Sequence, residues 1–438
     1  MTPALPAAVS WGRYPRLAQR RVEAAWRGDV ARILAEGGSA LPRGAGRSYG
    51  DCGQNEGGTL VDVSRMDRFI AFDAARAEVT VEAGMLLRDV ARWAQPRGFR
   101  LPATPGTLDV TVGGAIANDV HGKNHHVAGT FGCHVRRFSL LRGDGKVVEC
   151  TPGDELFVAT IGGLGLTGIV LEATLALRPA CSSFIQAESI PFEGLDGFFG
   201  LAADSNMSWE HTVAWLDCTS RGAGRGLFQR GRHVEDDEAS LARPWTPRSR
   251  RVPFDFPEVA LSSLTVRAFN ALYYRLARSS LRRVPAEKFL YPLDAIGDWN
   301  RLYGRRGFLQ FQCVVPPTQA PVAMSELLRA ITASGEGSFL SVIKTFGDIA
   351  SPGLMSFPRP GTTFALDFPM RGESTLRLLK QLERITLAAG GAIYPAKDAC
   401  MGADIFRTSF PNLERFRASV DPAFSSSFWR RVGAPAHA

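Results

Sequence analysis

Residues 105–107 read PGT, and residues 112–126 read VGGAIANDVHGKNHH. This segment places a glycine pair, Gly113–Gly114, and a run of small residues just before a polar cluster of His, Lys and Asn side chains. Glycine allows backbone N–H groups to approach a ligand closely, because it has no Cβ atom. We therefore expect the segment to form a wall of a large cofactor site rather than part of a packed core.

A second glycine-rich segment lies upstream, where residues 43–51 read RGAGRSYGD. Its three glycines permit turns with positive φ and can align N–H donors toward a pyrophosphate. Taken alone, such a segment is as consistent with a tight polar turn as with an anion-binding loop. Its combination with the Gly113–Gly114 segment favours a dinucleotide site.

A third segment, GGLGLTG at residues 162–168, contains the spacing G-x-G-x-x-G from Gly163 to Gly168. A Rossmann fold requires a helix directly after this motif and an acidic residue about 20 positions further on. Neither is present here, and the alternating pattern of residues 169–177 predicts a strand instead. We therefore reject a nicotinamide site and expect a loop that lies against another part of the same cofactor.

The three segments together resemble the FAD-binding domain of the vanillyl-alcohol-oxidase type, also called the PCMH type. Four further motifs are similar to the family of decaprenylphosphoryl-β-D-ribose 2′-oxidases: GFLQFQ at residues 307–312, KTFG at 344–347, DFP at 367–369 and AKD at 396–398. That family is the flavoprotein half of an epimerase that makes the arabinose donor of certain cell walls. The resemblance extends from about Trp11 to about Arg431, and HGKNHH at residues 121–126 is its most specific part.

The resemblance implies an α+β fold with two domains. We expect a PCMH-type FAD-binding domain over residues 1–178, and a substrate-binding cap domain with an antiparallel sheet flanked by helices over 179–394. The chain is then expected to return to the FAD domain over 395–438. Residue periodicity predicts, on its own, strands at 307–315, 338–346 and 362–368 and helices at 322–333 and 374–389.

The resemblance also implies which residues bind FAD. Members of this superfamily often attach the flavin covalently through a histidine in the first loop, where this chain has Arg47, so we expect non-covalent FAD. The expected FAD-binding residues are Arg43, Gly44, Ala45, Gly46, Arg47, Ser48, Tyr49, Gly50, Gly106, Thr107, Gly113, Gly114, Asn118, His121, Gly122, Asn124, Gly168 and Ile169.

The implied reaction is oxidation of a secondary hydroxyl, the 2′-OH of a polyprenyl-phosphate-linked pentose such as decaprenylphosphoryl-β-D-ribose, to a keto sugar. The protein must hold the C–H bond in place, remove the hydroxyl proton and stabilise negative charge. The expected catalytic residues are Lys397 for the electrostatic part, Tyr49 beside it, and His121, because imidazole suits proton transfer near neutral pH.

The period of two places Gln310 and Gln312 on one face of the predicted strand at 307–315. Such a pair often simply faces solvent, but the resemblance implies that it lines the substrate pocket. The expected substrate-binding residues are Gln310, Gln312, Lys344, Thr363, Ala365 and Lys397. Two of them depart from the family pattern: Thr363 replaces an asparagine, and Ala365 replaces the cysteine that captures the family's nitroaromatic inhibitors.

Two other functions remain open from the sequence. One is an aldonolactone oxidase of the D-arabinono-1,4-lactone type, or another sugar-alcohol oxidase of the superfamily; the other is a non-catalytic flavoprotein that serves as a partner subunit. The HGKNHH segment favours the lipid-linked substrate, and the joint presence of Lys397, Tyr49 and His121 argues for catalysis. We expect no metal site, because no carboxylate or cysteine at suitable spacing completes a ligand set with the four histidines between residues 121 and 134.

The composition is that of a globular protein of two domains, with 438 residues, 45% hydrophobic and 21% charged. Seven cysteines without a C-x-x-C pair argue against a disulfide framework and fit a reducing compartment, so we expect a cytoplasmic location. Residues 1–10 lack the pattern of a secretory signal, and no apolar run is long enough to span a bilayer.

Most of the net charge of +8 comes from residues 219–284, which contain thirteen arginines and six acidic residues. This arginine-rich region is consistent with a solvated, partly mobile loop, or with a surface that attracts anionic lipid head groups. Nucleic-acid binding is disfavoured, because no basic platform with interleaved aromatic residues accompanies the charge. The expected partners are a lipid-linked sugar phosphate, an anionic membrane surface such as that of the inner membrane and, by the resemblance, a short-chain reductase that completes the epimerisation.

Overall fold

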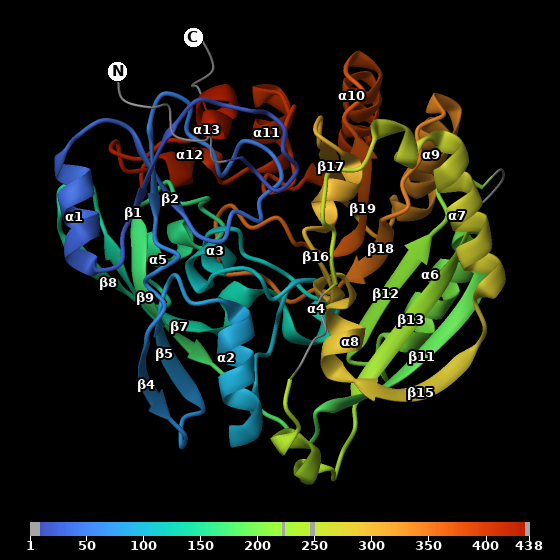
Figure 1. Cartoon of the computed structure of the whole chain (residues 1–438), viewed down its shortest axis with the longest axis horizontal. Coiled ribbons are helices and arrows are strands. Elements are labelled where there is room, and N and C mark those ends of the chain that lie inside the picture. Colours follow the sequence, from blue (N-terminus) through green and yellow to red (C-terminus); the bar gives the residue numbers. More distant parts are fainter. Residues whose placement is uncertain (1–8, 221–223, 246–249, 434–438) are drawn as a thin grey trace.

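The computed structural model describes residues 9–220, 224–245 and 250–433. Two small sheets lie in one half of the molecule and one large sheet lies in the other (Figure 1). Most of the N-terminal segment for which we expect no secretory signal, and parts of the arginine-rich region, fall outside the described residues. Among the described residues, no helix is both long and apolar enough to cross a membrane.

The small sheets are formed mainly by the first 176 residues. The first sheet is parallel, in the order β1-β3-β2, and the second is antiparallel, in the order β4-β5-β9-β7-β8. The strands are β1 (Arg20–Glu23), β2 (Ala40–Arg43), β3 (Thr59–Asp62), β4 (Phe69–Asp73), β5 (Glu78–Glu82), β7 (Val135–Leu141), β8 (Val147–Cys150) and β9 (Ile169–Ala176). Strand β9 confirms the strand predicted after the third glycine segment.

Five helices connect these strands. They are α1 (Arg27–Ala35), α2 (Leu87–Ala94), α3 (Val112–Ala117), α4 (His125–Ala128) and α5 (Glu155–Thr160). Helix α3 begins at Thr111, whose hydroxyl accepts a hydrogen bond from the backbone N–H of Gly114. The glycine pair of the first quoted segment therefore forms the first turn of a short helix.

The large sheet has eight strands, all of whose pairings are antiparallel, in the order β15-β11-β13-β12-β18-β19-β17-β20. Its strands are β11 (Phe184–Glu193), β12 (His211–Leu216), β13 (Arg225–His233), β15 (Ser280–Pro285), β17 (Phe308–Val315), β18 (Ser341–Phe346), β19 (Gly361–Pro369) and β20 (Ala392–Ile393). Together with the small sheets, it confirms an α+β fold with an antiparallel sheet flanked by helices.

Helices α6 (Gly194–Ser205), α9 (Ala320–Ser334) and α10 (Glu373–Ala388) pack on one face of the large sheet. Alternation along β17 confirms the predicted faces: Leu309, Phe311 and Cys313 belong to the core shared with these helices. Gln310 and Gln312 face the opposite side, toward the glycine segments. This face of the sheet is therefore available for a ligand site.

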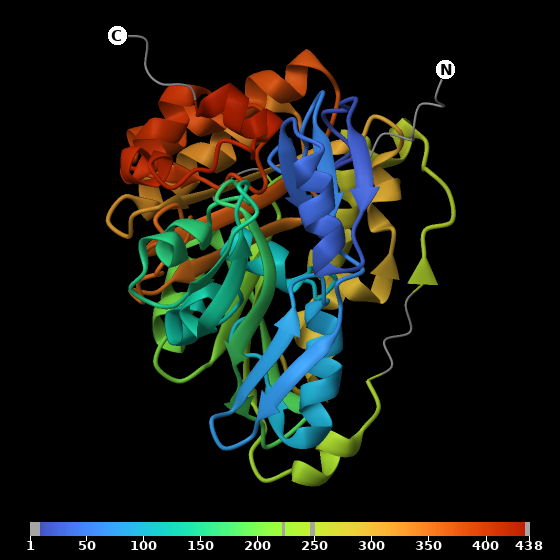
Figure 2. The same ribbon diagram turned by 90° about the vertical axis from the view of Figure 1, so that its left-hand side faces the viewer.

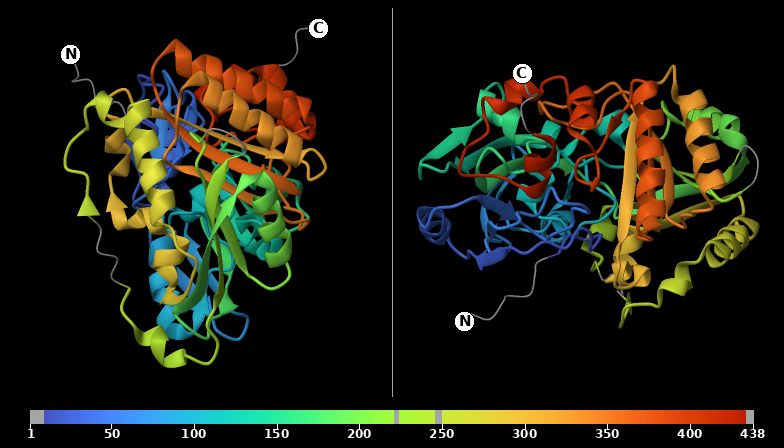
Figure 3. Two further views of the ribbon diagram at one scale, coloured as in Figure 1. Left: turned by 90° about the vertical axis from the view of Figure 1, so that its right-hand side faces the viewer. Right: turned by 90° about the horizontal axis from the view of Figure 1, so that it is seen from above.

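The arginine-rich region contains regular structure, so the mobile-loop interpretation is wrong for most of its described part. It includes β13, β15 and an amphipathic helix, α7 (Ser263–Leu276). Tyr273 of α7 packs edge-on against Trp215 of β12, whose neighbours Ala214 and Leu216 face the core with α6 and α9. Helix α7 therefore lies on the opposite side of the large sheet from those helices (Figure 3).

The last residues lie beside the small sheets. Helices α11 (Ala403–Ser409), α12 (Leu413–Arg417) and α13 (Ser427–Val432) lie over that half of the molecule (Figures 1 and 2). The guanidinium of Arg431 bonds both Asp51 and Asp398, at 2.7 and 3.0 Å, which ties the C-terminal residues to the second glycine segment. The domain limits at residues 178 and 394 stay a prediction; the large sheet comprises strands from Phe184 to Ile393.

Candidate functional site

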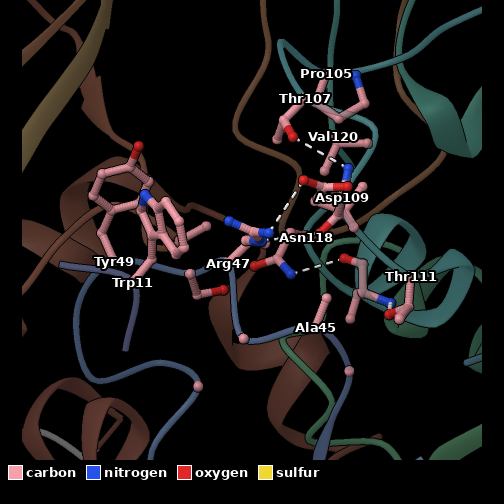
Figure 4. A pocket seen from close by; sticks show the side chains of 18 of the residues that line it. Trp11, Ala45, Arg47, Tyr49, Pro105, Thr107, Asp109, Thr111, Asn118 and Val120 are labelled. Atoms are coloured by element: carbon pink, nitrogen blue, oxygen red, sulfur yellow. Dashed lines mark hydrogen bonds and ion pairs between the residues drawn. The ribbon is translucent and has the colours of Figure 1, made fainter. Parts of the chain in front are cut away.

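A cavity of about 360 Å³ lies between the three glycine segments and the large sheet. Residues from the N-terminal half form one wall, and strands β17, β18 and β19 with the segment 394–397 form the other. Its volume is within the range of small-molecule and cofactor sites. Figure 4 shows the N-terminal wall, with Arg47, Asp109 and Asn118 close together.

Most of the predicted site residues line this cavity. The wall contains Arg43, Gly44, Ala45, Gly46, Arg47, Ser48, Tyr49, Gly106, Thr107, Gly113, Gly114, Asn118, His121, Gly168, Ile169, Gln310, Gln312, Lys344, Thr363, Ala365 and Lys397. Residues more than 350 positions apart in the sequence are thus brought to one site. Their individual roles stay predictions.

Three predicted FAD-binding residues, Gly50, Gly122 and Asn124, lie outside this wall. A Cβ atom on Gly50 would overlap the carbonyl oxygen of Asp398. The amide of Asn124 donates to the carbonyl oxygen of Pro102 at 2.8 Å. The carbonyl oxygen of Gly122 accepts a hydrogen bond from the ammonium of Lys344 at 2.8 Å. These contacts give the three residues structural functions, as supports for the wall.

The loop at residues 44–48 presents free hydrogen-bond donors. Within the part of the chain that the structure describes, the backbone N–H groups of these five residues have no hydrogen-bond acceptor. Gly46 has a φ of +64°, and a Cβ atom on Gly44 would overlap the hydroxyl of Thr111. Successive free N–H groups in such a turn form an anion-binding concavity. The loop therefore fits a pyrophosphate, as the sequence predicts.

The glycine pair at residues 113–114 behaves differently, and here the sequence-based reason is wrong. The N–H of Gly113 donates to the carbonyl oxygen of Ala83 at 2.8 Å, and the N–H of Gly114 donates to the hydroxyl of Thr111 at 3.2 Å. A Cβ atom on Gly113 would lie 3.1 Å from that of Ala83. The pair is therefore needed for the close packing of α3, and its N–H groups are already used.

Two buried polar atoms beside α3 lack partners among the described residues, and both belong to residues of the cavity wall. The amide nitrogen of Asn118 donates to the carbonyl oxygen of Gly114 at 2.8 Å (Figure 4), while its Oδ1 atom is unpaired. The Nδ1 atom of His121 is also unpaired. A buried polar atom without a partner is costly, so these atoms fit a ligand that carries polar edges, as an isoalloxazine ring does.

Arg47 is held by Asp109 and Trp11. Its Nη2 atom lies 3.2 Å from the Asp109 carboxylate, and its guanidinium carbon lies 4.1 Å from the centre of the Trp11 ring. Figure 4 shows the three side chains beside one another. A side chain with these two contacts is a positioned cation, and a guanidinium cannot form the imidazole linkage to a flavin.

Lys397 lies at the junction of the two walls. Its Nζ atom is 3.9 Å from the centre of the Tyr49 ring, and it interacts electrostatically with Asp367 of β19. Burial lowers the pKa of Lys397 and raises that of Asp367, and the opposite charge of each residue counteracts the shift of the other. The result is a buried cation balanced by one carboxylate.

Asp367 is a functional candidate that sequence reasoning did not select. Its Oδ1 atom accepts a hydrogen bond from the Gln310 amide, and its Oδ2 atom is buried without a bonded partner. In the sequence, the motif DFP at 367–369 contributes only to the family resemblance. The period of two could have indicated Asp367, because it places this residue on the same strand face as Thr363 and Ala365, two predicted substrate-binding residues.

His121 is a neutral imidazole in this site. Burial, together with Lys344, His125 and Lys397, lowers its pKa well below the ordinary value. Its Nε2 atom lies 3.1 Å from the Gln312 amide nitrogen, which also donates to Thr363. With this amide orientation Nε2 accepts, so the hydrogen of the imidazole is on Nδ1. The Nδ1 N–H of His121 therefore has no acceptor among the described residues, and Gln312 already occupies its acceptor nitrogen.

Lys344, Thr363 and Ala365 line the same face of the large sheet. Lys344 pairs with Thr363, and Ala365 lies between Val342 and Gln312 in the register of β18, β19 and β17. Burial, with Lys123 and Lys397 nearby, lowers the pKa of Lys344 to about 7. This side of the cavity therefore holds two lysines and fits an anionic ligand.

Residues 22–151 match the family model described as FAD binding domain. The chain is 37% identical over 422 residues to a decaprenylphosphoryl-β-D-ribose oxidase of Mycolicibacterium smegmatis, which covers 92% of this chain and 91% of that protein. It is 33% identical to an uncharacterized protein of Streptomyces coelicolor, over 79% of this chain and 99% of that protein. It is also 33% identical to L-gulonolactone oxidase of Mus musculus, over only 35% of this chain and 36% of that protein.

Proposed function

This chain belongs to the family of decaprenylphosphoryl-β-D-ribose oxidases, which are FAD-dependent oxidoreductases, and we propose that it oxidises the 2′-hydroxyl of a polyprenyl-phosphate-linked pentose to a ketone. The observation that carries the proposal is the position of Lys397, a buried cation where the FAD-binding wall meets strands β17 and β19. The family membership supports the class of reaction, and the residues that line the cavity support the assignment of individual functions.

FAD would be held chiefly by the N-terminal wall. The free N–H groups of residues 44–48 would bind its pyrophosphate. The unpaired Asn118 Oδ1 and His121 Nδ1 atoms would accept from and donate to the polar edges of its ring. We propose that binding is non-covalent, because Arg47 takes the place of a linking histidine.

Bound FAD would supply the acceptor for the two electrons that leave the 2′ carbon as a hydride. The chain itself must orient that carbon and stabilise negative charge as the hydroxyl proton leaves. Lys397 is the residue that we assign to this charge, because a preorganised cation in a buried site stabilises a transition state strongly. Asp367 and the ring of Tyr49 hold the ammonium in place.

Gln310 and Gln312 would orient the sugar. Asp367 fixes the amide of Gln310, and Thr363 and His121 fix the amide of Gln312. An amide held in one orientation presents its hydrogen-bonding atoms at fixed positions. Hydroxyl groups can pair with these atoms and an apolar ligand cannot, so the site favours a sugar. We assign His121 the function of a donor through Nδ1, since a proton-accepting function would require rotation of the Gln312 amide.

The substrate phosphate would be recognised by Lys344. Its ammonium is anchored to the carbonyl oxygen of Gly122 at 2.8 Å and lies on the same sheet face as Gln312 and Ala365. Burial without a carboxylate bonded to the ammonium makes a cation unfavourable. A bound phosphate would relieve this cost, so the site favours an anionic sugar over a neutral lactone.

We also propose that the protein docks on an anionic membrane through α7, where a polyprenyl-linked substrate would be located. The outer side of this helix exposes Leu264, Phe269, Leu272 and Leu276, and the side chains of Leu264 and Leu276 are 74% and 67% exposed. Helix α7 contains two arginines and no acidic residue. Apolar side chains flanked by basic residues on one helix are typical of helices that lie in the membrane interface.

Helix α7 is also connected to the cavity. It contacts the 3₁₀ helix Glu258–Leu261, which contacts the 3₁₀ helix Trp299–Tyr303. Trp299 lines the cavity. This chain of contacts supports the proposal that a lipid-linked sugar reaches the cavity from the side of α7.

Anaerobic reduction tests the proposed reaction. The full-length protein loaded with FAD is mixed without oxygen with decaprenylphosphoryl-β-D-ribose, with ribose 5-phosphate and with L-gulono-1,4-lactone, and the flavin absorbance is followed. We expect rapid bleaching by the lipid-linked ribose and much slower bleaching by the other two compounds. Bleaching by the lactone alone would replace our proposal with a lactone oxidase, and no bleaching by any of the three would contradict it.

The keto product would require a reductase, so we propose a short-chain reductase as the protein that acts next.

A further inference from the structure

Two histidines and one glutamate gather at the large sheet, outside the cavity. The cluster consists of Glu210, His211 and His233, and one ligand atom from each lies within 4.8 Å of those of the other two. The Nε2 atom of His211 is 3.6 Å from a carboxylate oxygen of Glu210, and the two imidazole rings are 5.6 Å apart between centres. The sequence did not indicate this cluster, because His233 is distant from the other two residues in the chain.

The register of the large sheet explains why the imidazoles meet. His211 of β12 lies opposite Gly231 of β13, and His233 follows two residues later on the same face. A Cβ atom on Gly231 would lie 2.8 Å from both Ile185 and Phe289. Glycine at this position therefore lets those two side chains pack against the strand next to the cluster.

The histidines of this cluster have free nitrogen atoms. The side chain of His211 is only 5% exposed, and neither of its ring nitrogens has a hydrogen-bond partner among the described residues. The same holds for Nδ1 of His233. Burial lowers the pKa of both histidines, so they are neutral near pH 7, the form in which imidazole binds a metal.

We propose that Glu210, His211 and His233 bind one divalent metal ion of the Zn²⁺ type. Two imidazoles and one carboxylate form a known ligand set for zinc, with the fourth position taken by water. Glu210 and His233 are only partly buried, so this fourth position is near solvent. The ion would satisfy buried nitrogen atoms that the protein leaves unpaired.

Arg100 is compatible with this site. Its guanidinium lies 3.0 Å from the Glu210 carboxylate, whose oxygens retain further lone pairs for a metal. Outer hydrogen bonds of this kind orient metal-bound carboxylates. Arg100 belongs to β6 (Phe99–Arg100), which lies outside the large sheet. A bound metal would therefore strengthen the contact between the large sheet and the N-terminal half.

Lys123 is the other cation that acts on His211. Its ammonium donates to the backbone carbonyl oxygen of Phe289, so it is already engaged in a hydrogen bond. A second group of potential ligands, Glu383, Asp398 and Cys400, offers no equally free site. Asp398 is paired there with Arg431 at 3.0 Å.

Equilibrium dialysis of the FAD-loaded, full-length protein against Zn²⁺, followed by elemental analysis, tests the proposal. We expect one zinc ion per chain and a rise in Tm on zinc addition. Both should be lost in His211→Ala and His233→Ala and weakened in Glu210→Gln. His134→Gln and Cys400→Ser serve as matched controls and should bind zinc like the unmodified protein. The flavin content of each variant shows that it has folded.

The proposal would be overturned if the protein bound no stoichiometric zinc. It would also be overturned if His233→Ala retained the zinc and Cys400→Ser lost it, because the ion would then lie at the other group. If both histidine variants fail to retain flavin, His233→Gln, which keeps a polar side chain of similar size, replaces them. None of these measurements uses turnover, so the outcome is independent of the proposed reaction.

Discussion

The ammonium nitrogen of Lys397 lies 3.9 Å from the centre of the Tyr49 ring, which places a buried cation on an aromatic face. Lys397 follows the last strand of the large sheet and Tyr49 belongs to the second glycine segment, so the contact joins the two walls of the cavity. The cation–π contact and the nearby carboxylate of Asp367 leave little freedom to the ammonium. Such a fixed charge is what a transition state with developing negative charge requires.

Replacement of Lys397 should therefore impair chemistry more than FAD binding. We expect Lys397→Ala to retain FAD and to lose turnover by roughly 10²-fold or more, the scale seen when one preorganised charge donor is removed. Turnover of an FAD-saturated sample and its flavin content are the measurements. Tyr49→Phe keeps the aromatic face and should lose much less activity than Tyr49→Leu. Near-normal turnover of flavin-loaded Lys397→Ala would refute the assignment.

The flavin should leave the protein on acid precipitation. Arg47 is paired with Asp109. The family resemblance puts it at the position of a linking histidine, and a guanidinium nitrogen does not form that bond. The measurement is the flavin absorbance of supernatant and pellet after precipitation with acid. Flavin that remains in the washed pellet would show that another residue of the cavity makes a covalent link.

The catalytic efficiency should fall as the pH rises through about 7. Burial, with Lys123 and Lys397 nearby, lowers the pKa of Lys344 to about 7. Below this pH its ammonium is charged and attracts the substrate phosphate; above it the neutral amine does not. The pH profile of kcat/KM reports the free enzyme, so the loss should appear there.

Lys344→Arg provides the matched variant for this pH dependence. A guanidinium stays charged at all accessible pH values, so the fall near pH 7 should vanish from the kcat/KM profile of the variant. A fall at the same pH in Lys344→Arg would assign the titration to another group. If Lys344→Arg loses activity but its kcat/KM still falls near pH 7, the proposed function of Lys344 in phosphate recognition is contradicted.

Much of this site follows from local sequence patterns. Glycine-rich turns are local properties, so the loop at residues 44–48 was predicted to line the site; its function as an anion site stays a prediction. The period of two placed Gln310 and Gln312 correctly, since it depends only on the geometry of one strand. Strands and helices with strong periodicity, such as β17 and α10, were predicted within a few residues.

Features that depend on contacts between distant segments were not predictable in this way. The N–H of Gly113 is engaged by the carbonyl oxygen of Ala83, thirty residues earlier in the chain, and no local pattern indicates this. The pairing of Asp367 with Gln310 is visible only in the register of β17 and β19. The charge of the arginine-rich region suggested a mobile loop, whereas packing of Tyr273 on Trp215 stabilises α7 there.

Apolar residues of α7 should contribute to membrane binding. Full burial of one large apolar side chain stabilises by about 1.5–3 kcal/mol, so Phe269→Ser with Leu272→Ser should weaken binding to anionic vesicles by tenfold or more, in the manner of other interfacial helices. Val322→Ser, at an exposed apolar position on α9, is the control and should bind normally. Cosedimentation at low and high salt separates the apolar part from the charge part, which salt screens. Equal binding of the double variant and the control would contradict docking through α7.

The absence of a thiol at position 365 should change the response to nitroaromatic inhibitors. Ala365 lies between Gln312 and Val342 on the sheet face that lines the cavity, and a methyl group cannot attack an electrophile. Such compounds should therefore bind reversibly, with Lys344, Lys397 and the two glutamines as the remaining contacts, and activity should return on dilution. Ala365→Cys should introduce time-dependent inactivation during turnover with little loss of activity, because the added sulfur faces the cavity rather than the core. Mass analysis of inhibited samples decides the matter: an adduct mapped to the cavity of the unmodified protein would show that a different nucleophile of the wall reacts.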